Sequence, residues 1–393
     1  MFRDLKPQPP DTILALLGQY RADERPGKID LGVGVYKDAS GQTPILRAVR
    51  AAEERMLGSE VTKTYTSLAG EPAFTRALSA MILGPDIDPA RVSAVGTTGG
   101  TGALRQAFEL VTRTSPQGAV WVSDPTWPNH LTILAHLGAK VRPYRYVDAD
   151  GTGFDRAGML ADLDAVRPGD TVLLHGCCHN PTGINPTLAD WADIAAVLSD
   201  RGAMVIVDLA YQGFGDGLEA DAAATRLLSA ALPELLIAAS CSKNFGIYRE
   251  RTGLLIGVSE PALAAVTQAN LVYLNRASHS FPPDHGARIV STILGDADLA
   301  ADWRAELDQI RTTMLSLREA LAAELRQIAG SDRFAYLAQH RGMFSRLPAT
   351  PGQIEALRRD HGIYIVGDGR MNVAGLNAAT VPILARAMIA AGI

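Results

Sequence analysis

Lys243 could act as a nucleophile, because it follows an apolar run typical of a buried strand. The run LLIAAS occupies positions 235–240, and Lys243 comes three residues later in the segment ASCSKNFG. The chain has six lysines, and none follows Lys243. A lysine removed from water has a lowered pKa and can attack an aldehyde, whereas a lysine at a strand end can also simply reach solvent. Both interpretations stay open on this residue alone.

Asp208 and Tyr211 could act on the same ligand from the end of another strand. Asp208 lies near the end of the apolar run MVIVDL at 204–209, and Tyr211 follows three residues later. Open α/β sheets bind ligands at the carboxyl ends of their strands. A carboxylate there is often only a helix cap. A buried carboxylate needs a cationic partner, and a protonated pyridine nitrogen is one candidate.

The segment TTGGTG at 97–102 could bind a phosphate group. It precedes the helix-like sequence ALRQAFELV and would offer backbone N–H groups at a helix N-terminus. Its spacing matches neither the dinucleotide-binding fingerprint nor the P-loop, and glycine-rich turns are often only structural. Ser240 and Arg251, on either side of Lys243, could add a hydroxyl and a guanidinium.

The segment LHGCCHNPTG at 174–183 contains residue types that bind metal ions. Its candidate ligands are His175, Cys177, Cys178 and His179. No second group of ligands occurs at a spacing typical of zinc sites, so we expect no metal. Asn180 is of more interest, because the Pro-Thr-Gly that follows it predicts a turn that would hold its side chain in place.

Five apolar runs are predicted to form the strands that position these residues. They lie at 119–124, 171–176, 204–209, 235–242 and 253–259, and they show little alternation with polar residues. Such runs indicate buried parallel strands with helices on both faces of the sheet, and segment 188–198 has helical spacing. The fold class is therefore α/β.

A long helix is predicted in the last third of the chain. Apolar residues recur at spacings of three and four from Leu299 to Ile328, and Gly330 stops the pattern. A helix of about 30 residues spans about 45 Å, which is long enough to pass from one domain into another. Segments 334–347 and 362–375 are predicted to form short strands around a helix at 351–361. We expect an N-terminal arm with part of a small α+β domain at 1–43, a large domain at 44–310, and the rest of the small domain at 311–393.

The composition is that of a globular protein and excludes several classes. Of the 393 residues, 47% are hydrophobic and 20% charged, and the net charge of −5 makes nucleic acid an unexpected partner. The N-terminus does not resemble a signal peptide and no run approaches about 18 apolar residues, so we expect a soluble cytoplasmic protein. The three cysteines, two of them adjacent, fit reduced thiols better than a disulfide framework.

Five motifs together resemble the class I aminotransferases, in particular the aspartate and aromatic amino acid aminotransferases. The motifs are GGTGALR, DPTWPNH, HGCCHNPTG, DLAYQGF and ASCSKNFGIYRERTG, and the resemblance runs from about Asp11 to the C-terminus. It implies a fold-type I transferase with a mostly parallel, mixed sheet between helices and a smaller α+β domain. It also implies pyridoxal 5′-phosphate (PLP) as cofactor and a homodimer with shared active sites.

The resemblance implies a role for each matching residue. Lys243 would hold PLP as a Schiff base and move the α-proton, Asp208 would pair with the pyridinium nitrogen, and Trp127 would stack on the ring. Tyr211 and Asn180 would bind the phenolic oxygen of the cofactor. The other matches are His130 and His175 as supporting residues, Gly100, Thr101, Ser240 and Arg251 around the phosphate, Tyr65 at the phosphate of the neighbouring subunit, and Gly34 and Arg370 at the substrate α-carboxylate.

Arg276 matches the family arginine that binds the distal carboxylate of dicarboxylic substrates across the dimer interface, although it could also be a surface cation. Thr64 and Phe281 stand where the aspartate-specific pattern has asparagines, and Phe281 adds an aromatic surface. The remaining pocket matches, Val35, Lys37, Thr43 and Thr101, agree with the aspartate-specific pattern. We expect ping-pong transamination of tyrosine, phenylalanine, tryptophan and aspartate with 2-oxoglutarate. The alternative is an aspartate aminotransferase with minor aromatic activity.

Other classes of function stay open. A nicotinamide-dependent oxidoreductase would use the glycine-rich turn at 99–102, but it leaves Lys243 and Asp208 unexplained. A catalytically silent ligand-binding protein, a decarboxylase or a β-lyase could share the fold. The combination of Arg276 and Arg370 favours the dicarboxylate cycle over these alternatives.

Overall fold

A seven-stranded sheet with the strand order β2-β8-β7-β6-β5-β3-β4 forms the centre of the larger unit of this protein. The computed structural model describes residues 1–7 and 11–393, so residues 8–10 of the expected N-terminal arm lie outside the description. The strands of the sheet are β2 (Val92–Thr98), β3 (Ala119–Asp124), β4 (Lys140–Arg145), β5 (Thr171–His175), β6 (Met204–Leu209), β7 (Leu235–Ser240) and β8 (Thr252–Val258).

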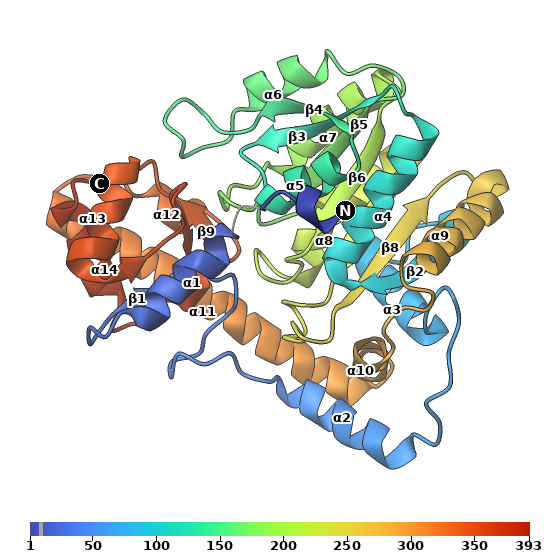
Figure 1. Ribbon diagram of the computed structural model, residues 1–393, viewed down its shortest axis with the longest axis horizontal. Helices are drawn as coiled ribbons and strands as arrows, with labels where there is room; N and C mark the ends of the chain where they lie inside the picture. Colours follow the sequence, from blue (N-terminus) through green and yellow to red (C-terminus); the bar gives the residue numbers. More distant parts are fainter. Residues whose placement is uncertain (8–10) are drawn as a thin grey trace.

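Helices cover both faces of this sheet (Figure 1). Neighbouring residues on one strand point to opposite faces. Val205 and Val207 accordingly pack in one hydrophobic cluster, and Ile206 packs in the other. The cluster of Ile206 contains residues of α4 (Gly99–Thr114), α5 (Pro128–His136) and α9 (Ala264–Ser278). The opposite cluster contains residues of α2 (Arg47–Ser59), α3 (Pro72–Leu83), α6 (Arg156–Leu163), α7 (Leu188–Asp200), α8 (Leu218–Ala231) and α10 (His285–Leu294).

The five predicted strands and the helix at 188–198 are confirmed, but the direction expected for one strand is wrong. Strand β8 pairs antiparallel with both β7 and β2, whereas the other neighbouring strands are parallel. Two parallel strands need a crossover connection, usually a helix. Residues 241–251 between β7 and β8 contain turns and no helix. The chain therefore reverses, and the apolar run alone could not reveal this.

The smaller C-terminal unit (Figure 1) contains two short strand pairs among the described residues. The parallel pair joins β1 (Ile29–Asp30) to β10 (Ile363–Tyr364), and the antiparallel pair joins β9 (Phe344–Arg346) to β11 (Arg370–Asn372). The helices of this unit are α1 (Thr12–Ala22), α12 (Tyr336–Gln339), α13 (Pro351–His361) and α14 (Val381–Ala390). Across both units, short 3-10 helices lie at Phe2–Asp4, Pro89–Arg91, Pro261–Leu263 and Val373–Gly375.

The predicted helix at 351–361 is confirmed as α13, but the strand expected over 334–347 is only partly right. Residues Tyr336–Gln339 within it form α12, whose Leu337 packs into the small core. Only Phe344–Arg346 at its end is extended and forms β9.

The long predicted helix is confirmed as α11 (Ala297–Ala329), which runs from the larger unit into the smaller one (Figure 1). Its cap residue Asp296 accepts N–H bonds from the first turn, and Gly330 ends it in the left-handed conformation with φ 61°. Met314 packs in the core of the larger unit, and Leu321 packs in the core of the smaller one. The two cores therefore meet within this helix. The domain limits at 43 and 310 stay a prediction.

The helices were compared with the length and apolar character that a membrane-spanning helix needs. In the described part of the chain, none is both long enough and apolar enough to span a lipid bilayer.

Candidate active site

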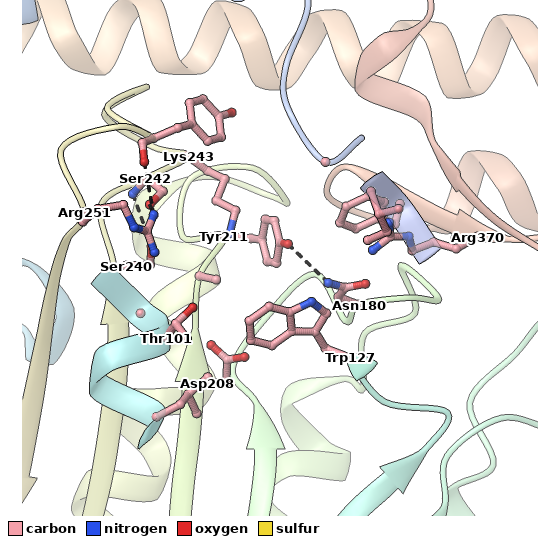
Figure 2. Close-up of a pocket in the computed structure, with 17 residues that line it drawn as sticks. Thr101, Trp127, Asn180, Asp208, Tyr211, Ser240, Ser242, Lys243, Arg251 and Arg370 are labelled. Carbon is pink, nitrogen blue, oxygen red and sulfur yellow. Dashed lines mark hydrogen bonds between the residues drawn. The ribbon is translucent and has the colours of Figure 1, made fainter. Parts of the chain in front are cut away.

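One cavity of about 270 Å³ lies between the two units, beside the carboxyl ends of β6 and β7 (Figure 2). Parallel strands bring their carboxyl ends to one edge of the sheet, and this edge is where residues of different strands can meet. The predicted site residues that line the cavity are Gly34, Gly100, Thr101, Trp127, Asn180, Asp208, Tyr211, Ser240, Lys243, Arg251 and Arg370.

Lys243 reaches into the cavity from the turn that follows β7, with its Nζ atom 4.7 Å from the centre of the Tyr211 ring (Figure 2). Removal of water by the surrounding protein lowers the pKa of its ammonium to about 8. The positive charges of Arg251 and Arg370 act in the same direction, and the Asp208 carboxylate opposes them. The unprotonated amine is therefore much more populated near neutral pH than in an ordinary lysine, while the ammonium remains the main form.

Asp208 accepts a hydrogen bond from a chain of buried side chains. The His130 Nε2–H donates to Asp208 Oδ2 at 3.0 Å, so the His130 Nδ1 accepts from the Thr126 hydroxyl at 2.9 Å. The His175 Nε2 lies 3.3 Å from the same hydroxyl oxygen and donates to it. Burial by itself raises the pKa of Asp208, but the His130 hydrogen bond, followed by the electrostatic effects of His130, His175 and Lys243, brings that pKa below its ordinary value. The carboxylate is thus ionised.

Tyr211 and Asn180 meet across the cavity, with the Asn180 Nδ2 donating to the Tyr211 hydroxyl at 3.5 Å (Figure 2). Burial, followed by the charge of Asp208, raises the pKa of Tyr211, so its hydroxyl keeps its proton. The Asn180 Oδ1 is buried without a hydrogen-bond partner. An unpaired buried acceptor is costly, and it suits a donor brought by a ligand.

The first turn of α4 forms a cradle for an anion. Its N–H groups have no side-chain acceptor from the cap residue Thr98. The Arg251 guanidinium lies over the turn, since a Cβ atom on Gly99 would come within 2.7 Å of its Nη2. The Arg251 Nη1 donates to the Tyr248 carbonyl at 3.1 Å and to the Ser242 hydroxyl at 3.4 Å. A helix N-terminus beside a guanidinium is suited to bind a phosphate.

Arg370 lies on the opposite side of the cavity from Arg251 (Figure 2). Only 4% of its surface is exposed, and its Nη2 donates to the Gly32 carbonyl at 3.0 Å. Its guanidinium lies 4.6 Å from the centre of the Phe344 ring, and its Nε has no hydrogen-bond partner. No carboxylate in residues 1–7 and 11–393 forms a salt bridge with Arg370. The buried guanidinium is therefore suited to bind a carboxylate ligand.

Tyr65 and Arg276 lie outside this cavity. Tyr65 is 79% exposed and stacks on Phe281 with ring centres 4.6 Å apart. Arg276 is exposed near the end of α9, where its Nη1 donates to the Ser280 hydroxyl at 2.6 Å. The structure of a single chain does not bring these two residues to the site. Thr64 is exposed in the same segment as Tyr65.

Several residues of the site were not predicted. Thr126, Ser242 and Tyr248 lie within the family motifs and Phe344 lies within segment 334–347, but no pattern distinguished them from their neighbours. Ile13 of α1 also lines the cavity, and nothing in the sequence around it pointed to the site. Thr126 lies two residues after the end of β3, and this position at a strand's carboxyl end was the available signal.

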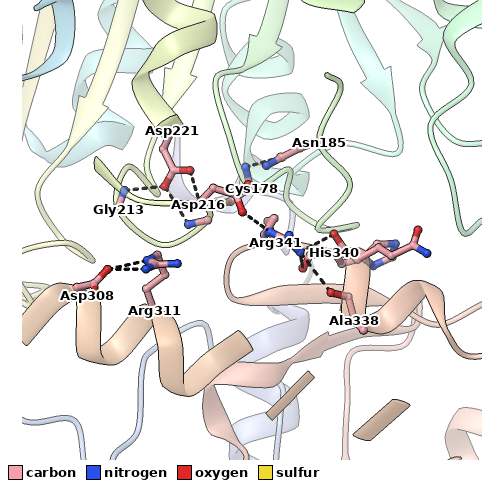
Figure 3. A network of polar contacts seen from close by, with 12 residues as sticks. Cys178, Asn185, Gly213, Asp216, Asp221, Asp308, Arg311, Ala338, His340 and Arg341 are labelled. Carbon is pink, nitrogen blue, oxygen red and sulfur yellow. Dashed lines mark hydrogen bonds and ion pairs between the residues drawn. The ribbon is translucent and has the colours of Figure 1, made fainter. Parts of the chain in front are cut away.

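The cysteines that suggested a metal site lie beside Asp221. The Sγ atoms of Cys177 and Cys178 and one carboxylate oxygen of Asp221 lie within 4.8 Å of one another. Asp221 already accepts backbone N–H bonds from Gly213, Gly215 and Asp216 (Figure 3). A hydrogen bond with Cys178 and burial raise the pKa of the Cys177 thiol, and burial raises that of Cys178. Because both of its oxygens already accept backbone hydrogen bonds, the Asp221 carboxylate is a poor metal ligand.

Comparison with known proteins agrees with this geometry. The family model described as "Aminotransferase class I and II" matches residues 26–388. The chain is 59% identical to the aromatic-amino-acid aminotransferase of Paracoccus denitrificans, with 100% of both chains covered. A solved structure of an aromatic amino acid aminotransferase with 3-indolebutyric acid superposes with a TM-score of 0.98 at 59% identity, again over 100% of both chains.

A second solved structure is an aromatic-amino-acid aminotransferase from Burkholderia pseudomallei covalently bound to pyridoxal phosphate. It is 37% identical, covers 100% of this chain and 99% of its own, and has a TM-score of 0.96. The match of the family model and the identity over the full chain length lead to one conclusion. The chain belongs to the class I and II aminotransferase family.

Proposed function

We propose that this protein is a PLP-dependent aminotransferase that exchanges amino groups between aromatic amino acids or aspartate and 2-oxoglutarate. The observation that carries this proposal is the set of groups in one cavity: the amine of Lys243 with its lowered pKa, the ionised carboxylate of Asp208, and the unpaired guanidinium of Arg370. The names and ligands of the similar proteins support it.

The cavity fits PLP on chemical grounds. The uncapped first turn of α4 and the Arg251 guanidinium suit the phosphate. Lys243 offers an amine to the aldehyde, and Asp208 offers a carboxylate to the ring nitrogen. The Tyr211 hydroxyl and the Asn180 amide suit the phenolic oxygen of the ring.

Lys243 acts as the acid and base of the proposed reaction. Bound PLP supplies an aldehyde that condenses with amines and a ring that withdraws electrons from the substrate Cα. The Lys243 amine takes the proton from the substrate Cα, and its ammonium returns a proton during the conversion to the oxo acid. A pKa of about 8 suits both directions, because both protonation states are populated near neutral pH.

Asp208 and Tyr211 keep their charge states through the cycle. Asp208 remains a carboxylate, held by the His130 Nε2–H, and therefore stabilises a protonated ring nitrogen. Tyr211 remains a neutral phenol, so its hydroxyl can donate a hydrogen bond to an anionic oxygen.

Arg370 orients the substrate. Its planar guanidinium can donate two parallel hydrogen bonds to the α-carboxylate. Trp127 and Phe344 line the same cavity and limit the water around the reacting atoms. Because an amino acid and an oxo acid present the same carboxylate, one site serves both half-reactions, and the first product leaves before the second substrate binds.

We further propose a homodimer in which Tyr65 and Arg276 complete the active site of the partner subunit. Both side chains are exposed and outside the cavity of their own chain. We also propose a cytoplasmic location, which the three free buried thiols support because free cysteines persist in reducing compartments.

Absorbance spectroscopy tests the reaction. Purified protein loaded with PLP is mixed with glutamate, and the pyridoxal band should convert to the pyridoxamine band. The Lys243→Ala variant should convert far more slowly, and Lys140→Ala, which changes an exposed lysine on edge strand β4, should behave like the wild type. An unchanged wild-type spectrum would rule out transamination and favour a silent binding protein.

Steady-state kinetics tests the substrate class. The values of kcat/KM are compared for aspartate, tyrosine, phenylalanine and tryptophan with 2-oxoglutarate as the acceptor. Values for the aromatic substrates at or above that for aspartate support the proposal. A value for aspartate that is larger than all of them by orders of magnitude would instead favour the alternative, an aspartate aminotransferase with minor aromatic activity.

Mixed dimers test the shared site. Lys243→Ala removes the amine of a chain's own site, and Arg276→Ala removes the residue proposed to act in the partner's site. Each variant alone should be nearly inactive toward aspartate. Dissociating and reassociating them at equal concentration should restore about a quarter of the wild-type activity, because half of the dimers are mixed and each has one intact site. A mixture that stays inactive would contradict the shared site.

A further inference from the structure

Arg318 is a buried arginine without a carboxylate partner. It lies on α11, and only 1% of its surface is exposed. In the part of the chain that the structure describes, no salt bridge involves it. Burial lowers the pKa of its guanidinium to about 9. Fold stability alone does not require such a costly group, since an apolar side chain of similar volume would often serve the core as well.

The Arg318 guanidinium gathers four acceptors from one segment, residues 337–345. Its Nη1 donates to the Ser345 hydroxyl at 2.6 Å and to the Leu337 carbonyl at 3.3 Å. Its Nη2 donates to the carbonyls of Phe344 at 2.7 Å and Gly342 at 2.8 Å. The guanidinium thus joins the end of α12 to the start of β9 across the irregular residues 340–343.

The 337–345 segment ends at the substrate side of the cavity. The Phe344 ring lines the cavity and lies 4.6 Å from the Arg370 guanidinium and 6.0 Å from the Tyr211 ring. A Cβ atom on Gly34 would come within 2.9 Å of the Phe344 Cζ. Phe344 is therefore held closely between the groups proposed to bind the substrate carboxylate.

The same segment also attaches the smaller unit to the larger one (Figure 3). The backbone N–H of Arg341 donates to the Gly183 carbonyl at 2.7 Å, and Gly183 lies three residues after Asn180 of the cavity. The side-chain Nε of Arg341 donates to Asp216 at 2.6 Å. The His340 Nε2–H donates to the Thr152 carbonyl at 3.0 Å.

A continuous chain of hydrogen bonds joins Arg318 to the larger unit. The His340 Nδ1 must accept, because its Nε2 carries the proton donated to Thr152. The Ser345 hydroxyl therefore donates to His340 at 3.1 Å while it accepts from Arg318. Each donor in such a chain polarises the next, so the guanidinium strengthens the contact between the units.

We propose that Arg318 is a positioning residue for substrate carboxylate binding: it shapes the 337–345 segment so that Phe344 holds the Arg370 guanidinium in its binding orientation. The inference rests on the proposed role of Arg370. Arg318 touches neither substrate nor cofactor and acts only through Phe344 and the contact of His340 and Arg341 with the larger unit. A lysine cannot replace it fully, because a single ammonium cannot reach acceptors arranged around a planar fork.

Ligand binding by the PLP-loaded protein tests the proposal. The probe is 3-phenylpropionate, which has a carboxylate and no amino group and so reports binding without reaction. Arg318→Met should raise its Kd about tenfold, as expected when one charge-assisted contact is misaligned. The KM for tyrosine should rise similarly with little change in kcat, and Arg318→Lys should give intermediate values. Arg304→Met, an exposed arginine on the same helix, is the matched control and should leave Kd unchanged.

Unchanged Kd and KM in a folded Arg318→Met protein would overturn the proposal, as would a fall in kcat at constant Kd. If Arg318→Met does not fold, Ser345→Ala decides, because it interrupts the chain between Arg318 and His340 with a smaller change. A raised Kd in that variant supports the proposal, and an unchanged Kd overturns it. Arg370→Lys is measured alongside. If the Arg370→Lys variant binds the probe as the wild type does, the proposed role of Arg370 is wrong, and the inference about Arg318 is wrong as well. A failure confined to Arg318 and Ser345 leaves the proposed function intact.

Discussion

Gly253 allows the close approach that shapes the proposed phosphate cradle. It lies on β8, paired with Thr97 on one side and Ser240 on the other. A Cβ atom at this position would come within 2.4 Å of the Gly99 carbonyl carbon, 2.6 Å of the Gly99 oxygen and 2.8 Å of the Gly100 nitrogen. All three are backbone atoms of the first turn of α4, so a rotamer change cannot relieve the clash.

The size of the effect follows from these distances. Carbon atoms in contact lie about 3.5–4.0 Å apart, so Gly253→Ala must move the start of α4 or strand β8 by about 1 Å. That shift would lengthen at least one N–H bond to the phosphate beyond the normal range, and a hydrogen bond to a charged group contributes about 1.5–3 kcal/mol. We predict that PLP binds about 10- to 150-fold more weakly. Overpacking should also destabilise the fold by about 1–3 kcal/mol.

The assay is a titration of apoprotein with PLP, followed by quenching of tryptophan fluorescence, with a thermal melt in parallel. Gly257→Ala is the matched control, because it lies on the same strand and its Cβ would meet the Thr267 side chain at 2.8 Å rather than backbone. The control should lose some stability and keep the wild-type Kd for PLP. A Gly253→Ala protein whose Kd stays within about twofold of the wild type would refute the reasoning that this approach shapes the cradle.

Three further predictions concern the charged and aromatic residues of the site. The rate at which apoprotein takes up PLP should rise with pH and be half-maximal near pH 8. The reason is that only the unprotonated Lys243 amine attacks the aldehyde, and the pKa of this amine is lowered to about 8. A midpoint near the ordinary value of 10.5 would contradict this prediction. Arg370→Lys should raise the KM for aspartate and tyrosine by about 10- to 150-fold, since an ammonium cannot form the bidentate pair, and an unchanged KM would argue against its role. Phe281→Asn should shift the ratio of kcat/KM toward aspartate and loosen Tyr65, which stacks on Phe281; a constant ratio would show that aromatic preference arises elsewhere.

Much of the fold could be predicted because burial leaves a local trace in the sequence. The limits of β3 and β6 follow from continuous apolar runs, and most of α11 follows from the helical period of its apolar residues, with Gly330 marking its end. Pairing direction leaves no such trace. The run that forms β8 is as apolar as its parallel neighbours, and only the short connection at 241–251 makes it antiparallel. The turn of helix at α12 was missed for a related reason, because a few residues fit either period.

Some residues of the candidate site could likewise be predicted from the sequence, and others could not. Lys243 and Asp208 could be found because each follows or ends a buried run, and the five motifs together identified the family. Phe344 and Thr126 could not be found, because their importance comes from contacts with residues distant in the chain. Arg318 is the clearest case, since in sequence it is one of many arginines on a helix.

The sequence by itself determined which residue types stand at the ends of the strands, the approximate course of α7, α11 and α13, and the family to which the chain belongs. Only the tertiary structure decided that the amine of Lys243 loses enough water to have a pKa of about 8, that His130 keeps Asp208 ionised, and that Arg370 lies buried without a carboxylate. The physical reason is that desolvation and charge coupling depend on distances between segments far apart in the chain, and such distances arise only when the units pack together.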